Sequence, residues 1–323
     1  MRSIIQSTFI GIALACATPV TALAQTFPTK AVRLVVPFPP GGPADMLARL
    51  IAEKLTDRWG QTVVVESISG AAGNIGAEAI ARAVPDGHAL LLNASSHVIN
   101  GILYTKLPYD PFKDFTPISQ VASYQHMFVV HPALPVKTVR EFVALAKTKP
   151  GQLTVGNSGV GTPGNLAAEL FKITAGIDII SVSYKGSAPA TTDLLGGQIN
   201  AMFNNPVNTL PYTAAGKLRA IGVTSKQRLA VAPDVPTVAE SGYPGFEAGT
   251  WFGLYGPAGV PSAVATKIQE DVARALRLPD VRQKLAAQAW DSIGNTPAEF
   301  LDVMKSDHET WSKVIKAAGI RPQ

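Results

Sequence analysis

The chain has 323 residues, of which 46% are hydrophobic, and its 28 Lys or Arg and 23 Asp or Glu give a formal net charge of +5. This excess is small for the length and is scattered without a basic block, which argues against nucleic acid as a partner. A chain near this length usually exceeds one compact core and divides into two.

The N-terminus has the pattern of a secretory signal peptide. Arg2 is the only charge before an apolar run that starts at Ile4, and Ala22-Leu23-Ala24 provides a small-residue cleavage site. We therefore predict a signal peptide over residues 1–24, with cleavage before Gln25 and export to the periplasm. No later apolar run approaches the roughly 18 residues that cross a bilayer, so the mature chain is expected to be soluble.

The single cysteine, Cys16, lies inside this predicted signal peptide, so the mature chain is expected to have no disulfide. Acylation of Cys16 in a lipoprotein is the alternative. The preceding Ala13-Leu14-Ala15 argues against it, because a lipidated cysteine is expected to have leucine three places before it.

Apolar segments typical of strands alternate with amphipathic segments typical of helices. In the first part of the chain, the pattern predicts strands at 31–36, 62–66 and 88–92, with helices at 43–59 and 75–83. Repetition of strand, helix and strand indicates a parallel sheet with helices on both faces.

The same unit is predicted a second time further along the chain. Its elements are helices at 139–147, 166–175 and 188–195 and strands at 153–156, 179–184, 199–203 and 218–223. A connector rich in Pro and Gly follows at about 233–249. The last predicted helices are at 264–276, 280–288, 297–304 and 308–318.

These patterns predict an α/β protein of two lobes, each a mainly parallel sheet flanked by helices. The late helices could pack back on the first lobe, so the first lobe would comprise 25–123 with 235–323, and the second 124–234. The chain would then cross between lobes twice, at 118–130 and before Trp251 to Tyr255, and the two crossings would form a hinge. Trp251 and Tyr255 themselves are expected to pack in the core or hinge, and the alternative is that they line the cleft.

The loop Pro37 to Asp45 joins the first predicted strand to the first helix. Its glycines allow a ligand to approach the backbone, and a helix N-terminus offers free N–H groups that suit a carboxylate. Ligand clefts of open α/β sheets lie at this end of the strands. The alternative is a rigid turn in which Asp45 stabilises the first helical turn.

A second loop, Gly156 to Asn165, joins a strand to a helix in the second lobe. It contains G-x-G-x-x-G, the dinucleotide fingerprint, but the next strand ends in Tyr184-Lys185-Gly186 without an acid to hold a ribose, and an exported chain is away from nicotinamide pools. No cofactor is therefore predicted. The N–H groups and the Ser158 and Thr162 hydroxyls could still receive an anion.

A third loop, Ser69 to Gly76, repeats the arrangement after the second strand. Asn74 in this loop could instead be only a helix cap. Because parallel strands end on one side of a sheet, the three loops are expected to converge on one cleft. Asn204, after the strand 199–203, could add an amide donor.

Catalytic and metal-binding patterns are weak. Gly156-Asn157-Ser158-Gly159-Val160 breaks the G-x-S-x-G nucleophile elbow at its last position. The five histidines, His88, His97, His126, His131 and His308, have no recognisable metal-ligand spacing. We predict no catalytic residue and no metal site.

The strings PFPPGGPADMLAR, YKGSAPATTDLLGGQINAMF and DVPTVAESGYPGFEAGTWFGLYGPAGVP are long and specific. In these and other segments, over essentially all of the mature chain, the sequence resembles the solute receptors of tripartite tricarboxylate transporters, the Bug receptor family. The resemblance implies a type II periplasmic binding protein, or Venus flytrap, without enzymatic activity. It implies capture of a small carboxylate, such as a di- or tricarboxylate, an acidic amino acid or an aromatic carboxylate, and delivery to two membrane subunits.

The resemblance also implies which residues contact the ligand. These are Phe38, Pro39, Gly41, Gly42, Asp45, Gly73, Asn74, Asn157, Ser158, Gly161, Thr162, Lys185, Gly186 and Asn204. Family members commonly have His where this chain has Asn165 and often an acid where it has Asn204. Both differences argue against a cationic ligand group at those points.

Two other classes of function stay open from the residues alone. A sensory receptor that signals to a kinase would have the same fold. An exported hydrolase of small esters would need a nucleophile with a base in reach, and only Ser158 or Ser187 could be nominated. We expect a monomer whose partners are the ligand and the membrane subunits.

Overall fold

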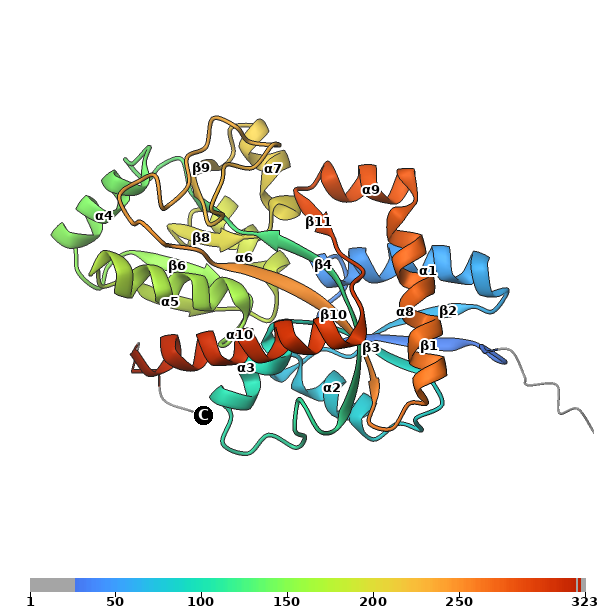
Figure 1. The fold of residues 1–323 in the computed structure, drawn as a ribbon. Helices are drawn as coiled ribbons and strands as arrows, with labels where there is room; N and C mark the ends of the chain where they lie inside the picture. The colour runs from blue at the N-terminus through green and yellow to red at the C-terminus, as the bar shows by residue number, and fades with distance from the viewer. Residues whose placement is uncertain (1–26, 318, 321–323) are drawn as a thin grey trace, which may run out of the picture.

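The structure, a computed structural model, describes residues 27–317 and 319–320. Two α/β lobes lie side by side, each built on one sheet with helices packed against it (Figure 1). The predicted two-lobed α/β fold is therefore confirmed. The predicted signal peptide and its cleavage site lie outside the described residues.

The first lobe contains a six-stranded sheet in the order β11-β4-β10-β3-β1-β2. Its strands are β1 (Val32–Val36), β2 (Val63–Ser67), β3 (Ala89–Ala94), β4 (Phe115–Gln125), β10 (Gly249–Pro257) and β11 (Trp290–Ser292). β1, β2 and β3 pair in parallel, whereas β10 pairs antiparallel to both β3 and β4. β10 returns from the second lobe, which is why it enters this sheet in the opposite direction.

The second lobe contains a five-stranded sheet in the order β7-β6-β8-β5-β9. Its strands are β5 (Met127–Val130), β6 (Thr154–Asn157), β7 (Ile180–Ser183), β8 (Ala201–Asn204) and β9 (Arg219–Val223). β5, the strand that enters from the first lobe, is antiparallel to both of its neighbours, β8 and β9, whereas β6 pairs in parallel with β7 and β8.

The helices follow the strands in chain order. Those of the first lobe are α1 (Pro43–Trp59), the short 3-10 turn η1 (Ala71–Gly73), α2 (Asn74–Ala81), α3 (Ser96–Leu103), α8 (Ser262–Arg277), α9 (Pro279–Ala286) and α10 (Pro297–Ala317). Those of the second lobe are α4 (Val139–Thr148), α5 (Pro163–Ala175), α6 (Ser187–Leu195) and α7 (Pro206–Ala214). None of the helices within residues 27–317 is both long and apolar enough to span a bilayer.

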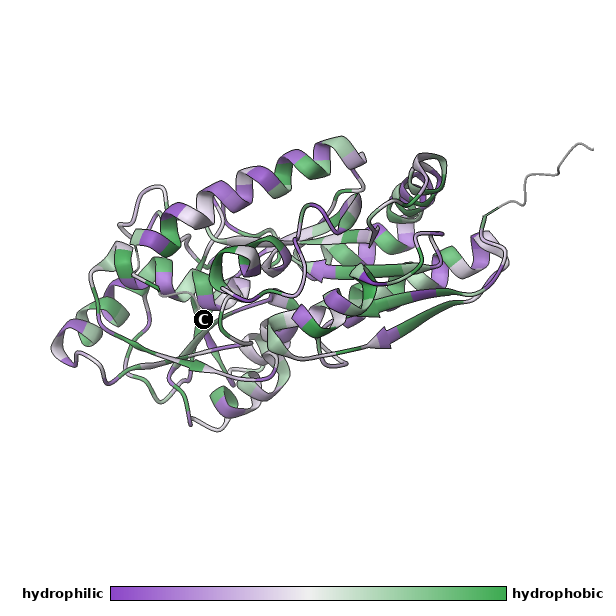
Figure 2. Cartoon of the chain, turned by 90° about the horizontal axis from the view of Figure 1, so that it is seen from below, coloured by the Kyte–Doolittle hydropathy of each residue, from purple (hydrophilic) through white to green (hydrophobic). Residues whose placement is uncertain are grey.

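The two helices predicted at 297–304 and 308–318 are wrong as separate elements, because α10 is continuous from Pro297 to Ala317. Its buried residues are Phe300, Met304, Trp311 and Ile315, which keep helical spacing through the polar middle. Figure 2 shows this long helix with both hydrophobic and hydrophilic residues along its length, while the strands are largely hydrophobic.

Each sheet packs against helices through clusters of buried apolar side chains that belong to its own lobe. In the second lobe, Phe128 packs in the middle of an aromatic cluster with Phe142, Phe171 and Phe203. In the first lobe, Trp251 and Tyr255 are 6% and 0% exposed and pack against Phe300 of α10. The prediction that these two aromatic residues pack in the core is confirmed.

The chain passes between the two sheets at two adjacent places. His126 is the single residue between β4 of the first sheet and β5 of the second. Near the second place, Ala248 immediately precedes β10. The Thr224 hydroxyl accepts a hydrogen bond from the His126 amide at 2.8 Å and donates to the Ala248 carbonyl at 2.7 Å. Thr224 therefore links the two connecting segments to each other.

Asp307 on α10 is a partly buried acid whose carboxylate accepts hydrogen bonds from Trp251 Nε1 at 3.2 Å and Trp311 Nε1 at 3.0 Å. Burial raises the pKa of Asp307 to about 6, although both indole donors lower it. The native state therefore holds this proton more tightly than the unfolded chain does. The resulting stabilisation is complete below about pH 4 and is lost as the pH rises through about 6.

We expect this to be measurable against Asp307→Asn, which does not titrate. Between pH 4 and pH 8 the wild-type protein should lose about 2 kcal/mol of unfolding free energy relative to the variant, since one pKa unit corresponds to about 1.4 kcal/mol and the unfolded carboxyl is already about half ionised at pH 4. Urea unfolding at both pH values measures the difference. Asp302→Asn, at an exposed position of the same helix, controls for removal of a negative charge. Parallel pH profiles for wild type and Asp307→Asn would contradict the assignment.

Candidate functional site

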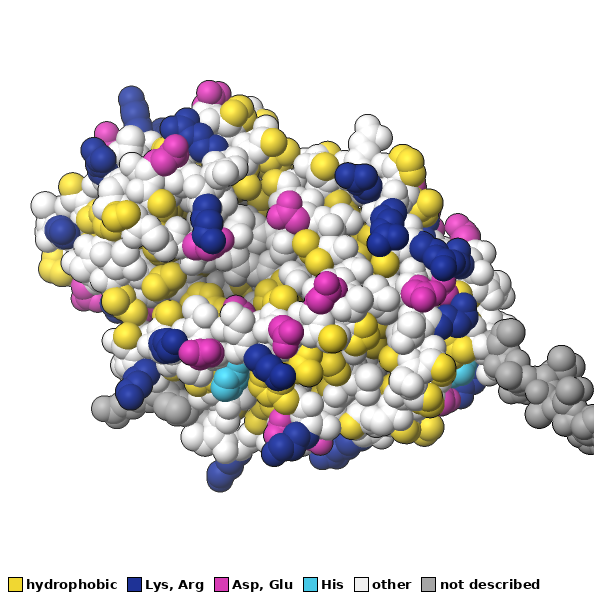
Figure 3. Space-filling view, viewed as in Figure 1, with side chains coloured by type: hydrophobic (Ala, Val, Ile, Leu, Met, Phe, Trp, Pro, Cys, Tyr) yellow, Lys and Arg dark blue, Asp and Glu magenta, His cyan; other side chains and the backbone are white. Residues whose placement is uncertain are grey.

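A cavity of about 680 Å³, counted out to its opening to solvent, lies between the two lobes. Its walls come from the loop before α1 in the first lobe and from the starts of α5 and α6 in the second. Its remaining wall is formed by Ala94 of β3, by Tyr124 and His126 at the end of β4, by residues of β8, and by Phe252 of β10. Figure 3 shows the surface hollowed between the lobes, with charges of both signs interspersed.

Three helix N-termini meet at this cavity. α1, α5 and α6 all begin in its lining, and none of the three has a side-chain cap. Among the other described helices, α4 and α7 are capped by Thr138 and Asn205, whereas α2, α3, α8 and α9 also lack a side-chain cap but do not begin in the cavity lining. First-turn N–H groups have no partner within a helix, and the N-terminus carries partial positive charge. Ala44, Gly164 and Ala188, in those first turns, therefore place unsatisfied donors at the cavity wall, where an anion would be stabilised.

Hydroxyl groups at the cavity differ in what they can offer. The Thr162 hydroxyl already donates to the Gly159 carbonyl at 2.7 Å, so it holds the loop rather than donating to a ligand. The Ser187 Oγ accepts a hydrogen bond from Asn208 Nδ2 at 2.9 Å, which leaves its own proton available. Ser158 also lines the cavity. The serine hydroxyls are therefore better placed as donors than Thr162.

The structure brings half of the residues expected at the site into the cavity lining. These are Phe38, Pro39, Gly42, Ser158, Thr162, Gly186 and Asn204. The others are not part of that lining, and they are Gly41, Asp45, Gly73, Asn74, Asn157, Gly161 and Lys185. Several of this second group hold the lining loops in shape.

Asp45 and Gly41 are connected to each other behind the first loop. The Gly41 amide donates to Asp45 Oδ2 at 3.1 Å, and Arg49 pairs with the same carboxylate at 3.0 Å. Burial raises the pKa of Asp45, but the hydrogen bonds from Arg49 and Gly41 and the Arg49 charge outweigh it and leave this pKa below its ordinary value. Asp45 therefore stays ionised and fixes the turn that presents Gly42.

Asn157 has the same kind of role behind the second loop. Its Oδ1 accepts from the Gly159 amide at 2.9 Å and its Nδ2 donates to Ser181 Oγ at 3.0 Å. The Gly161 amide donates to Asn165 Oδ1 at 3.0 Å. These contacts hold the turn that leads into α5.

The third loop is directed away from the cavity lining. Asn74 Oδ1 accepts from Asn100 Nδ2 at 2.6 Å and from the Tyr109 hydroxyl at 2.8 Å, so this side chain is used inside the first lobe. Gly73 has φ +96°, a conformation that glycine adopts readily, at the turn before α2. Lys185 is exposed.

Some lining residues are not among those predicted to contact the ligand. Tyr124, His126 and Phe252 lie on or beside the central strands β4 and β10, and Ser187 begins α6. From the sequence these two stretches are predicted only as crossings, and it is their position between the lobes that brings the side chains to the cavity. His126 does fall within the predicted crossing 118–130.

A search with protein-family models matches residues 47–320 to the family described as tripartite tricarboxylate transporter family receptor. The chain belongs to this family. The receptor is 34% identical over 317 residues to protein BugT of Bordetella pertussis, covering 97% of each chain. The resemblance inferred from its sequence motifs is therefore confirmed.

Solved structures of related proteins have the same fold. R. palustris Rpa4515, solved with adipate, is 36% identical to the receptor with a TM-score of 0.89, over 92% of this chain and 100% of that one. MatC from Rhodopseudomonas palustris, solved with bound malate, is 32% identical with a TM-score of 0.85, over 90% of this chain and 100% of that one.

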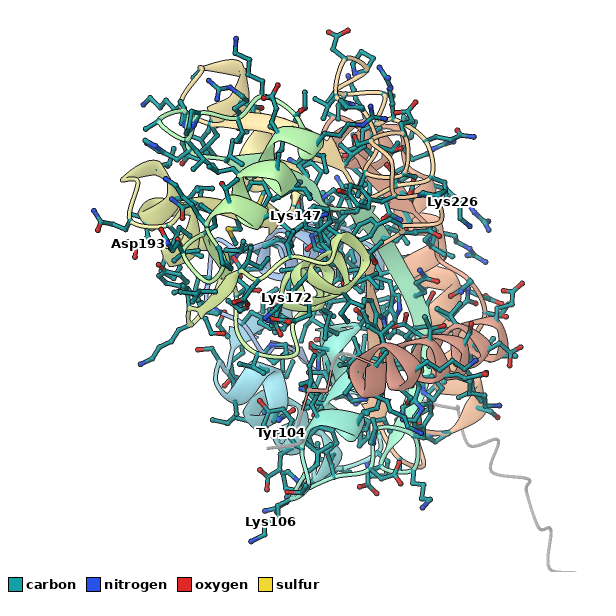
Figure 4. The ribbon with its side chains drawn as sticks, turned by 90° about the vertical axis from the view of Figure 1, so that its left-hand side faces the viewer. Tyr104, Lys106, Lys147, Lys172, Asp193 and Lys226 are labelled. Atoms are coloured by element: carbon teal, nitrogen blue, oxygen red, sulfur yellow. The ribbon has the colours of Figure 1, made fainter. Side chains whose placement is uncertain are left out.

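The described residues that line the receptor's cavity include no Lys, Arg, Asp or Glu. Figure 4 shows the labelled Lys106, Lys147, Lys172 and Lys226 at the outer surface of the molecule. Among the described residues, no group of three or more His, Cys, Asp or Glu could hold a metal ion. A ligand in this cavity would therefore be bound by backbone N–H groups, hydroxyls, amides and one imidazole.

Proposed function

We propose that this protein is a periplasmic receptor that encloses a small carboxylate between its two lobes and delivers it to the membrane subunits of a tripartite tricarboxylate-type transporter. One observation carries the proposal: three uncapped helix N-termini meet at a cavity whose described lining lacks any charged Lys, Arg, Asp or Glu side chain. Such a site favours an anion without requiring a fixed cation. The family membership and the relatives solved with adipate and malate support the same ligand class.

We further propose that the protein is exported by its N-terminal signal peptide and acts as a monomer whose lobes close on the ligand. The first crossing is better placed at His126 than between residues 123 and 124, because Tyr124 and Gln125 still pair with β10 in the first sheet. The second crossing is better placed at the start of β10, because Val238, Phe246 and Ala248 pack in the core of the second lobe. Gly186 and Pro39, on opposite lobes, lie close together, as expected of lobes that close.

Catalysis is not part of this proposal. A hydrolase would need a nucleophile within hydrogen-bond reach of a base. His126 lines the same cavity as Ser158 and Ser187, but both of its ring nitrogens lack a hydrogen-bond partner among the described residues. A sensory role would use the same binding site, and identification of the membrane partner would separate it from transport.

The proposal is tested by thermal unfolding in the presence of mono-, di- and tricarboxylates, adipate and malate among them. A ligand at a hundredfold its Kd should stabilise the protein by about 2.7 kcal/mol and raise the unfolding midpoint. Hexane-1,6-diol, which matches adipate in length but lacks charge, should leave the midpoint unchanged. If no carboxylate stabilises the protein, or the diol does so equally, the carboxylate-receptor proposal fails. Turnover of any of these compounds would show an enzyme instead.

A further inference from the structure

A hydrogen bond between two side chains joins the lobes beside the first crossing. Trp290 Nε1, on β11 of the first lobe, donates to Asn205 Oδ1 of the second lobe at 3.3 Å, and both side chains are buried. β11 lies at the boundary between the lobes, next to α7 (Figure 1). Neither residue belongs to the described lining of the ligand cavity, so the bond has no direct part in holding a ligand.

The two sheets place this bond at the hinge. In the first sheet β11 pairs with β4, and Trp290 lies opposite Tyr124, two residues before His126. In the second sheet β8 pairs with β5, and Asn205 directly follows β8. Thr224 directly follows β9, the other neighbour of β5, and bonds to both crossing segments. Each of the two strands that flank β5 is therefore followed by a polar side chain bonded across the junction between the lobes.

Trp290 is held in the first lobe by aromatic packing. Its indole stacks on Phe252, with the ring centroids 5.3 Å apart and the planes at 4°, and lies 5.1 Å from the ring of Tyr124. Phe252 and Tyr124 both line the ligand cavity. The donor of the inter-lobe bond is therefore fixed to the first lobe and lies directly behind its cavity wall.

Asn205 is held in the second lobe by hydrogen bonds. Its Oδ1 also accepts from the Val207 amide at 2.7 Å and so caps α7, and its own amide donates to Asn204 Oδ1 at 2.8 Å. Its Nδ2 is buried and has no hydrogen-bond partner among the described residues, which is unfavourable. The bond from Trp290 offsets part of this cost while the lobes are in contact.

Rotation of the lobes would act directly on this bond. Trp290 moves with the first lobe and Asn205 moves with the second, because each side chain is fixed within its own lobe. The usual N···O distance of such bonds ends at about 3.2 Å. At 3.3 Å the bond is already long, so a small opening rotation about His126 breaks it.

We propose that Trp290 and Asn205 form an inter-lobe clasp, a hydrogen bond that is made when the lobes close and broken when they open. Both are positioning residues, because they contact residues of the cavity lining and not the ligand. The inference rests on the proposed receptor function and adds what controls the release of the ligand. Since the ligand enters the open state, in which the clasp is absent, loss of the clasp should speed dissociation and leave association unchanged.

The test begins with Trp290→Phe, which removes the N–H donor and keeps an aromatic ring against Phe252. Stopped-flow fluorescence measures both rate constants for each carboxylate that stabilises the protein in the thermal screen, adipate and malate included. The dissociation rate constant should rise about three- to tenfold, the usual contribution of one hydrogen bond. The association rate constant should stay within about twofold of wild type.

Trp251→Phe is the matched control. Trp251 also donates an indole hydrogen bond, to Asp307 at 3.2 Å, but this bond lies entirely within the first lobe. Its loss should lower the stability of the fold and leave both rate constants within about twofold of wild type. Circular dichroism checks that every variant folds.

A double-mutant cycle separates the hydrogen bond from ring packing. Asn205→Ser keeps an oxygen that can cap α7, but its side chain is too short to reach the indole. In that background the clasp is already absent, so Trp290→Phe should change the dissociation rate constant by less than about twofold. A loss of ring packing alone would give the same factor in both backgrounds.

The outcomes distinguish the clasp from the receptor proposal. The clasp is overturned if Trp290→Phe leaves dissociation unchanged, slows association instead, or acts equally in the presence and absence of Asn205→Ser. It is also overturned if Trp251→Phe speeds dissociation as much. In each of these cases wild type still binds a carboxylate, and the receptor proposal stands. If no carboxylate bound to wild type, both proposals would fall.

Discussion

Gly186→Val is expected to weaken carboxylate binding by about 10- to 100-fold. Gly186 has φ +150° and precedes the first turn of α6, a conformation that is essentially restricted to glycine and costs other residues about 1–3 kcal/mol. A Cβ atom at this position would lie 3.2 Å from Cγ and 3.4 Å from Cδ of Pro39, which belongs to the opposite lobe. The branched side chain would therefore hold the lobes apart and move the α6 N-terminus, so the closed, ligand-bound state loses stability relative to the open one.

The matched control is Gly176→Val. Gly176 also has a positive φ, +59°, and lies in the same lobe, but a Cβ there has no atom within 4 Å. This variant should lose a comparable amount of folding stability while keeping the parent's affinity. Calorimetry measures the affinity, and small-angle scattering with saturating ligand should show a larger radius of gyration for Gly186→Val than for the control. Equal affinities in the two variants would mean that contact between Gly186 and Pro39 does not accompany binding.

Much of the fold could be predicted because its strands and helices have clear periodic patterns. The missed helices are those whose pattern is obscured. α3 is short and Ser96 to Asn100 are all buried, so its polar residues do not mark a solvent-exposed face. α7 contains Pro206 and Pro211, and proline is usually a sign of a loop. In α10, the polar residues around Asp307 suggested a break, but none of them disrupts a helix.

The residues of the site also fall into those that the sequence predicted and those that it did not. The loops before α1 and α5 could be predicted because Gly-rich turns after parallel strands lie at the cleft of such folds. The loop before α2 has the same composition, yet its Asn74 is satisfied by Asn100 and Tyr109 inside the first lobe. His126 could not be predicted as a lining residue, because its exposure to the cavity depends on how two lobes distant in sequence pack together.

Phe128→Ala is expected to lower the unfolding free energy by about 3–5 kcal/mol, the usual range for removing a buried aromatic side chain. Phe128 is 0% exposed. Its ring stacks on Phe203 at a centroid distance of 4.2 Å and lies edge-on to Phe142 and Phe171 at 4.9 and 5.2 Å. Truncation removes three aromatic contacts at once and leaves a cavity beneath β5 that these rigid rings cannot easily fill.

The same substitution should also perturb the binding site, through the strand pairing of the second lobe. Phe128 pairs with Phe203 on β8, and Phe203 lines the ligand cavity, so relaxation of the cluster would shift the cavity wall. Urea unfolding measures the stability loss, and Ile180→Ala, at a side chain 46% exposed on β7, serves as the surface control with a change within about 0.5 kcal/mol. A loss of unfolding free energy below about 1 kcal/mol for Phe128→Ala would show that the neighbouring rings collapse into the vacated space. An aromatic cluster that repacks so easily could not hold the cavity wall in a fixed position.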